Sequence, residues 1–240
     1  MAIGDMINAA IAADVNSNKP PAAAWVADAY IGASSQYVYR GIALRNNGPV
    51  VTAGLSLKHS SGWFIDTWAG RVDAENYYAY SYTREWLLDF SAGYGAQLSP
   101  TWQWSLSHAW VTGVDSALPV SQNYQEWRAN LFYRNDTAVQ FAYTRDYRQL
   151  GWPAWNIEIE KQPYLTTTFS GDLGLGHAHN SGFPDPDYNY AWLGVQTEWL
   201  GTNWRLRWIH SDNNARYVLG DDRAGNRVEL ALTWHFAVLR

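Results

Sequence analysis

The chain has no cysteine, only two methionines and only three lysines among its 240 residues. The absence of cysteine excludes disulfide bonds, thiolate metal sites and cysteine nucleophiles. Acidic residues outnumber lysine and arginine by 22 to 17, and the net charge is −5, so the chain lacks the basic character that nucleic-acid binding needs. Nucleic acid is therefore not an expected partner.

Long hydrophobic runs are also absent. No stretch reaches the roughly 18 to 20 apolar residues that a membrane-spanning helix requires. Aromatic residues are abundant instead, with 15 Trp and 16 Tyr, and the aromatic fraction equals the charged fraction at 16%. These features leave a β protein, either a soluble sandwich or a transmembrane barrel whose strands turn only every second residue to lipid.

Residues 1–24 differ from the rest of the chain. They are rich in alanine and end in a turn-forming linker at 16–21. Asp5 and Asp14 interrupt the apolar core that a secretory signal would need, and no basic start precedes it, so a signal peptide is not evident in this numbering. We expect a helix, a plug or a disordered lead here, followed by one domain over 25–240.

From Trp25 onward, apolar and polar residues alternate with a period of two, which is typical of half-buried strands. Trp204, Leu206 and Trp208, for example, share one face, while Arg205 and Arg207 share the other. The pattern predicts about twelve strands, at 25–41, 49–59, 62–71, 85–97, 101–111, 123–134, 136–145, 154–161, 166–178, 188–200, 203–211 and 227–237.

The connections between these strands alternate strictly between short and long. Short turns lie at 60–61, 98–100, 135–136, 162–165 and 201–202, and longer connections lie between them. This alternation is typical of an outer-membrane barrel, with short periplasmic turns and long extracellular loops. We therefore predict an all-β fold, a single antiparallel up-and-down transmembrane barrel in the outer membrane of a Gram-negative bacterium.

Large aromatic residues gather near the strand ends on the apolar parity. In a membrane barrel such residues form girdles at the lipid headgroups; in a soluble protein they would fill the core. The girdle candidates are Trp25, Tyr37, Tyr39, Trp63, Trp86, Trp102, Trp127, Trp155, Trp199, Trp204 and Trp234.

The opposite parity carries many charges, which a dry core does not tolerate. In a barrel this face lines the lumen. With Asp146 counted, it carries about eleven acids and six cations, an excess of about five acids that favours cationic or neutral solutes. Alternatively, opposed charges pair and close the lumen, for example Glu126 and Arg128 with Glu158 and Glu160. The lumen candidates are Asp28, Arg40, Lys58, Asp66, Glu85, Asp89, Glu126, Arg128, Arg134, Glu158, Glu160, Asp172, Glu198, Arg205, Arg207 and Glu229.

A set of motifs marks residues 33–70. Ser35, Tyr37, Arg40 and Gly41 lie in the first predicted strand, Pro49 precedes the second, and Ser61, Gly62, Thr67 and Trp68 lie in or next to the third. In this order they resemble the opening of the TorF-like family of outer-membrane porins. The resemblance implies an outer-membrane barrel and a pore, without a defined substrate.

Arg40 stands out within this segment. It lies on the lumen parity at the end of the first predicted strand. Two interpretations are open: a charge that sets selectivity at a constriction, or a salt bridge to an acid on the second, third or twelfth strand that holds the barrel closed.

Residues for chemistry are sparse. His59 with Ser60 and His210 with Ser211 are neighbours, but adjacent strand residues point to opposite faces, so neither pair makes a catalytic dyad. His177 and His179 lie near Asp185 and Asp187, a pattern that suits a metal or an ordinary loop. Since no phosphate-binding loop is present either, we predict no catalytic, metal or cofactor site.

The sequence therefore predicts a channel for small cationic or neutral solutes, with membrane lipid and solutes as partners. One alternative is a non-conducting anchor barrel that binds partner proteins, or a second copy of itself, through aromatic loops such as 76–82 and 185–190. An outer-membrane lipid hydrolase is the third.

Overall fold

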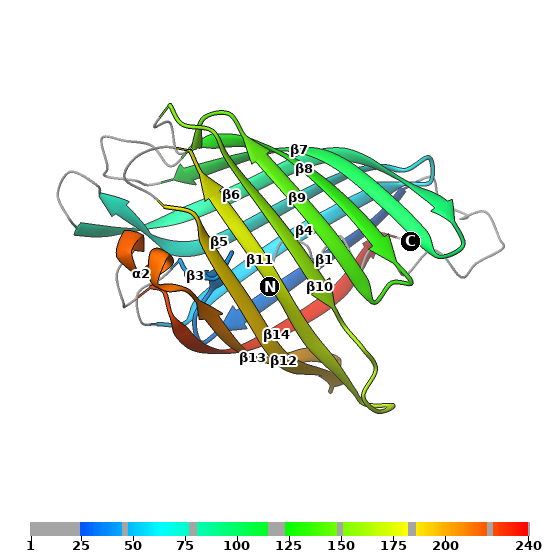
Figure 1. Ribbon diagram of the computed structural model, residues 1–240. Coiled ribbons are helices and arrows are strands. Elements are labelled where there is room, and N and C mark those ends of the chain that lie inside the picture. Colours follow the sequence, from blue (N-terminus) through cyan, green and yellow to red (C-terminus); the bar gives the residue numbers. More distant parts are fainter. Residues whose placement is uncertain are drawn as a thin grey trace.

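The computed structural model describes residues 25–44, 48–76, 81–114, 123–147, 151–181, 186–219 and 223–239. Twelve antiparallel strands in this part of the chain form one closed barrel (Figure 1). The predicted barrel is confirmed, and the soluble sandwich is excluded because β1 pairs with both β4 and β14 and leaves no open edge. The barrel strands are β1 (Trp25–Ser34), β4 (Val50–His59), β5 (Trp63–Asn76), β6 (Ser81–Ser99), β7 (Trp102–Val114), β8 (Tyr124–Tyr133), β9 (Thr137–Thr144), β10 (Ala154–Lys161), β11 (Phe169–Asn180), β12 (Tyr188–Trp199), β13 (Thr202–Ser211) and β14 (Asn226–Leu239).

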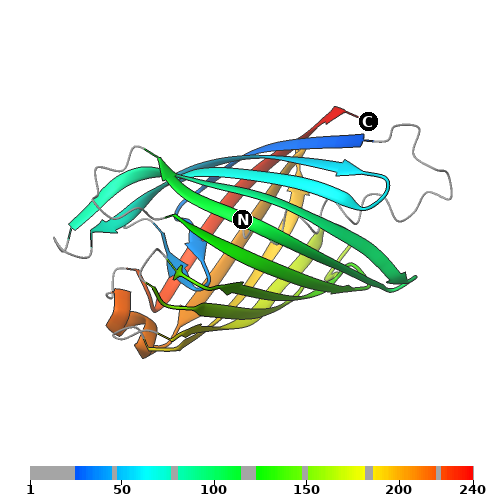
Figure 2. The same ribbon diagram turned by 90° about the horizontal axis from the view of Figure 1, so that it is seen from above.

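Each strand of the wall pairs with its neighbours in sequence, apart from the closing pair of β1 and β14. Short turns connect strands at one end of the barrel, and the longer connections gather at the other end, next to α2 (Asn213–Leu219) (Figures 1 and 2). We call these the short-turn end and the loop end. No helix in the described ranges is long and apolar enough to cross a membrane.

The first predicted strand, 25–41, is wrong in its extent. β1 ends at Ser34, and the chain then turns into a small separate hairpin of β2 (Val38–Tyr39) and β3 (Ile42–Ala43). The strands expected at 62–71 and 85–97 are longer than predicted, since β5 and β6 pair from Trp63 to Asn76. Residues 1–24 lie outside the described residues, as does most of the proposed partner loop at 76–82.

Side-chain burial follows the alternation of the sequence. On β13, Leu206 and Trp208 are 46% and 47% exposed, whereas Arg205 and Arg207 are 7% and 6% exposed. Since the wall is one sheet thick, the exposed parity faces outward and the buried parity points into the interior. The barrel is thus apolar outside and polar inside, the reverse of a water-soluble fold.

Candidate functional site

The β2–β3 hairpin turns at Arg40 and Gly41, both of which have positive φ (51° and 75°). Two such residues in succession make the tight turn whose twist suits a two-residue hairpin. A Cβ atom on Gly41 would lie 2.4 Å from the Cβ of Tyr190, so only glycine allows the turn to lie this close to β12. The turn is therefore shaped for its contact with the barrel wall.

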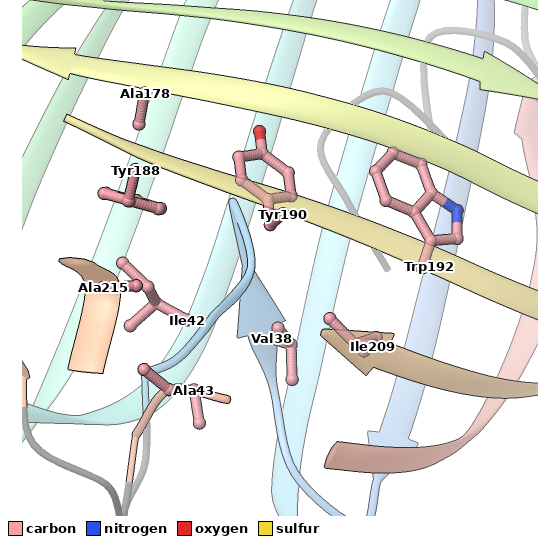
Figure 3. Packing of buried hydrophobic residues seen from close by; sticks show 10 residues of the cluster. Val38, Ile42, Ala43, Ala178, Tyr188, Tyr190, Trp192, Ile209 and Ala215 are labelled. Atoms are coloured by element: carbon pink, nitrogen blue, oxygen red, sulfur yellow. The ribbon is translucent and has the colours of Figure 1, made fainter. Parts of the chain in front are cut away.

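One side of the hairpin packs against β12 and β13. Val38, Ile42 and Ala43 are buried in a cluster with aromatic residues of β12 and apolar residues of β11, β13, α2 and the segment before β14 (Figure 3). Figure 3 shows Tyr190 and Trp192 on the same strand, which passes next to the hairpin, and their rings extend over Gly176 and Gly174 of β11. The partners of the hairpin in this cluster are Ala178, Tyr188, Tyr190, Trp192, Ile209, Ala215 and Ala224.

The other side of the hairpin packs against β1, β4 and β5. Tyr37 is 1% exposed and stacks on Trp68, with ring centroids 5.1 Å apart, in a cluster that includes Tyr30 and Val50. Backbone hydrogen bonds also hold the segment, because the carbonyl of Leu44 accepts from the N–H of Asp73 and the N–H of Ala43 donates to the carbonyl of Arg223, just before β14. The hairpin is thus held inside the barrel on two sides (Figure 2).

Arg40, at the tip of the hairpin, reaches the opposite wall. Its guanidinium donates two hydrogen bonds of 2.9 Å to the two carboxylate oxygens of Glu126 on β8. Glu126 also accepts from Arg128 at 2.8 Å, and Arg128 donates two further bonds to Asp89 on β6. Two cations and two acids therefore form one chain of charge-assisted bonds, the arrangement that buried charges require.

A second cluster of charges lies on β11, β13 and β14. Arg207 donates to both carboxylate oxygens of Asp172, at 2.5 and 2.9 Å, and the indole of Trp192 donates to the same carboxylate at 2.9 Å. Arg205 bonds Glu229 at 3.4 Å. On β12, the hydroxyl of Tyr190 donates to Glu158 at 2.6 Å. This arc of the wall is filled by paired charges and large aromatic rings.

The predicted lumen residues fall into four groups. Asp28, Arg40 and Lys58 are half-buried in the interior, Arg134 and Glu198 are exposed, and the side chain of Glu85 lies outside the described residues. Those buried in the interior are Asp66, Asp89, Glu126, Arg128, Glu158, Glu160, Asp172, Arg205, Arg207 and Glu229.

Three expectations about these charges need correction. Arg134 lies in the β8–β9 turn, where its φ is 52° and its guanidinium covers the ring of Tyr133, so it points away from the interior. Arg40 pairs with an acid on β8 rather than on the second, third or twelfth predicted strand, because the hairpin carries it across the barrel. Glu126 and Arg128 likewise pair with Arg40 and Asp89 instead of Glu158 and Glu160.

Most girdle candidates are exposed on the outer face: Trp25, Trp63, Trp86, Trp102, Trp127, Trp199 and Trp234 are 39–60% exposed. Trp155 and Trp204 are half-buried. The assignment of Tyr37 and Tyr39 to the girdle is wrong. They belong to the inward hairpin, where Tyr37 is buried and Arg40 lies 4.7 Å above the ring centroid of Tyr39.

The residues considered for chemistry remain dispersed. His59 Nδ1 lies 2.6 Å from Ser61 Oγ in the β4–β5 turn, a pair that the sequence did not reveal, but no carboxylate in the described part of the chain bonds this histidine. His179 lies 2.8 Å from Asp187, and His177 bonds Asn189. Within the residues that the structure describes, no three side chains gather as a metal site.

Asp187 lies outside the strands, just before β12. Partial burial favours its neutral form, but hydrogen bonds from the His179 ring and from the backbone N–H of Asn180 outweigh burial and lower the pKa of Asp187. The histidine and the aspartate thus stabilise the ends of β11 and β12 at the loop end.

The whole barrel corresponds to a recognised bacterial family. Residues 18–238 match the profile of Gcw_chp, described as bacterial proteins of unknown function. The chain belongs to the Gcw_chp family. The TorF-like name suggested by residues 33–70 is not confirmed. Among curated proteins, none matches the sequence.

Solved structures resemble this Gcw_chp chain in fold at low sequence identity. A structure from work on in-meso crystallization of membrane proteins is 9% identical over 89% of this chain and 84% of that chain, with a TM-score of 0.56. The KdgM porin in complex with disordered oligogalacturonate is 8% identical over 88% and 99%, with a TM-score of 0.52. The P. putida toluene transporter TodX is 8% identical over 90% of each chain, with a TM-score of 0.50. The Gcw_chp barrel therefore shares its fold with porin and transporter barrels.

Proposed function

We propose that the protein is an outer-membrane channel for small solutes, narrowed by the β2–β3 hairpin. The observation that carries the proposal is the bond between Arg40 and Glu126, which fixes the hairpin across the interior of a closed barrel. A segment held between opposite walls reduces the free cross-section, so only small solutes would pass. KdgM is a porin that forms a complex with oligogalacturonate, and the likeness in fold agrees with a channel role.

The outer face supports the membrane location. Outward side chains at mid-strand, such as Leu106, Phe141 and Leu206, are more than 40% exposed. Exposure of this apolar surface to water is unfavourable, and contact with lipid removes that cost. Tryptophans lie on the same face nearer the strand ends, where headgroups accept the indole N–H. Lipid is therefore the proposed partner of this surface, and the Gram-negative outer membrane is the proposed location.

The charges of the interior support small cationic or neutral solutes. Among the described residues of the barrel strands and the hairpin tip, the inward side chains that are buried or half-buried comprise eight acids and six cations, a smaller acidic excess than the sequence predicted. Arg227, which is not among the predicted lumen residues, contributes to this difference. The acids are Asp28, Asp66, Asp89, Glu126, Glu158, Glu160, Asp172 and Glu229, and the cations are Arg40, Lys58, Arg128, Arg205, Arg207 and Arg227. Outside the strands, the buried Arg223 next to the hairpin adds one more cation.

The test is single-channel recording of purified protein in planar bilayers under a potassium chloride gradient. The wild type should give small cation-selective steps, and a variant with residues 36–44 replaced by a short Gly-Ser linker should give larger steps. A matched variant carries a Gly-Ser linker in place of residues 164–168, which are exposed between β10 and β11, and should behave like wild type. If neither the wild type nor the hairpin-deletion variant gave channel currents, the proposal would be contradicted.

A second function, a non-conducting anchor barrel, is favoured by the burial of the charges at mid-interior, several of which are less than 2% exposed. In that case only the deletion variant would conduct, and the partners would bind at the loop end, whether proteins or a second copy. A hydrolase has no comparable support, because the His59–Ser61 pair lies in an exposed turn.

A further inference from the structure

Hydrogen bonding of the buried polar groups is not uniform around the barrel interior. On β8, β10 and β11, the buried acids accept bonds from arginine, glutamine, tyrosine or tryptophan. On β4 and β5, in contrast, several buried polar atoms of the described residues have no hydrogen-bond partner of good geometry, among them both carboxylate oxygens of Asp66, the hydroxyl of Ser56 and the indole nitrogen of Trp68. Such groups call for a water or a ligand.

Asp66 belongs to a row of polar residues across neighbouring strands. In the register of the sheet, Asp28 on β1 lies opposite Ser56 on β4, and Ser56 lies opposite Asp66 on β5. Residues opposite each other point to the same face, so all three side chains point into the interior. With strands about 4.8 Å apart, the two aspartates stand roughly 10 Å apart with the serine hydroxyl between them.

The neighbouring charged and polar side chains do not satisfy the hydrogen-bonding capacity of Asp66. Ser56 lies close enough to approach Asp66 as a hydrogen-bond donor, and Lys58 adds a nearby positive charge, yet among the described residues neither carboxylate oxygen of Asp66 has a hydrogen bond of good geometry. Asp66 is 5% exposed and Ser56 is 5% exposed, so bulk water does not surround them. An acid buried to this degree favours a cation or a hydrogen-bond donor as its neighbour.

The row also lies next to the constriction. Trp68 follows Asp66 by two residues on the same face of β5, and Tyr37 of the hairpin stacks on Trp68. Asp66 lies on the short-turn side of that stack, because β5 runs from the short-turn end to the loop end. A solute that passes the hairpin would next meet the two aspartates.

We infer that Asp28, Ser56 and Asp66 form a binding site for a small organic cation that carries an ammonium group. The ammonium donates hydrogen bonds to the Asp66 carboxylate, and the second carboxylate supplies further negative charge. The neighbouring ring of Trp68 offers a face that attracts cations. This inference rests on the proposed channel function, because it assigns the channel a class of solute and a binding site for that solute.

Binding is measured first without conduction, by calorimetric titration of detergent-solubilised protein with spermidine at low ionic strength. D66N should weaken binding about tenfold, the effect of removing one charge contact worth about 1.4 kcal/mol. D28N should weaken it less, because Asp28 is only half-buried. E198Q, which removes an exposed acid at the short-turn end of β12, is the matched control and should bind like wild type.

K58Q gives a change of opposite sign, since removal of the neighbouring cation should strengthen spermidine binding. It keeps the inference falsifiable if D66N does not fold, which heat-modifiable mobility on gels would reveal. Equal binding by wild type, D66N and K58Q would overturn the site and leave water as its occupant. Equal weakening in D66N and E198Q would overturn it in favour of surface attraction.

The bilayer recordings separate this inference from the channel proposal. If wild type conducts and spermidine block is lost in D66N but kept in E198Q, both stand. If wild type binds spermidine through Asp66 but never conducts, the channel fails and the site stands. If wild type conducts and D66N keeps the same block and reversal potential, the site fails and the channel stands.

Discussion

Arg40 and Glu126 are 86 residues apart in the sequence, and their side chains join the tip of the inward hairpin to the far wall of the barrel through two hydrogen bonds of 2.9 Å. In the order of strands around the barrel, β8 lies five strands from β1 in one direction and seven in the other. The hairpin and the Arg40 side chain together therefore reach across most of the interior. Substitution of Arg40 is a direct test of whether the hairpin limits the passage of ions.

R40Q should raise single-channel conductance severalfold and increase open-channel noise. Glutamine cannot replace two charge-assisted bonds, each worth about 1.5–3 kcal/mol, so the hairpin tip would move freely. R40K keeps the charge but loses the planar paired geometry and should give an intermediate conductance. R134Q, which removes an exposed turn arginine, serves as the control. Unchanged conductance in R40Q would mean that the hairpin does not set the aperture.

E126Q should lower the free energy of unfolding by about 3 kcal/mol, because it leaves the guanidinium of Arg40 without the carboxylate that it binds across the barrel. Urea titrations of tryptophan fluorescence in lipid vesicles measure this loss. E198Q changes an exposed acid on β12 and should stay within about 0.5 kcal/mol of wild type. A loss in E126Q as small as that in E198Q would contradict a structural role for the pair.

G41A should displace the hairpin and raise conductance as R40Q does. Its Cβ would lie 2.4 Å from Tyr190, in addition to the strain of a positive φ, about 1 kcal/mol. Gly151 gives a matched control, since it has a similar φ of 79° but no atom lies within 4 Å of the place that a Cβ would take there. G151A should therefore carry the backbone strain alone and conduct like wild type; an equal effect of both substitutions would rule out the contact with Tyr190 as the cause.

L206R should destabilise the folded protein by about 2–4 kcal/mol if lipid surrounds the barrel, because Leu206 points outward near the middle of β13. In water the same substitution would cost little, since the side chain is 46% exposed. Y217R, on the exposed side of α2, introduces the same charge outside the strands and should be neutral. Equal stability of the two variants in vesicles would argue against a lipid-facing wall.

Acid should loosen the ends of β11 and β12 through Asp187. The pKa of Asp187 is lowered in the folded protein, so its contribution to stability is fully present above the ordinary value of about 3.9 and is lost as pH falls through the folded value. The protection factor of the Asn180 amide, which donates to Asp187, should fall over that range when hydrogen exchange is compared with the intrinsic rate at each pH. In D187N the exchange rate should be fast already at neutral pH; protection that survives the substitution would exclude this role.

The alternation of residues such as Leu206 and Arg207 is sufficient to predict the wall of the barrel, because one face meets an apolar surrounding and the other does not. It fails at Tyr37 and Tyr39, which continue the same parity after the chain has left the wall. The sequence holds one signal for the turn, a glycine after Arg40 that adopts a positive φ. The partner of Arg40 could not be predicted, since nothing local relates residue 40 to residue 126.

The hairpin follows directly from β1, and β1 is the strand that closes the barrel against β14. The residues that the hairpin contacts, however, include those of β5, β8, β12 and β13, strands that come later in the sequence. Contacts of such long sequence separation form slowly, since loop closure must precede them. The hairpin can dock only when these strands are in place, so we expect its docking to be the last step of folding and an incomplete barrel to have an open centre.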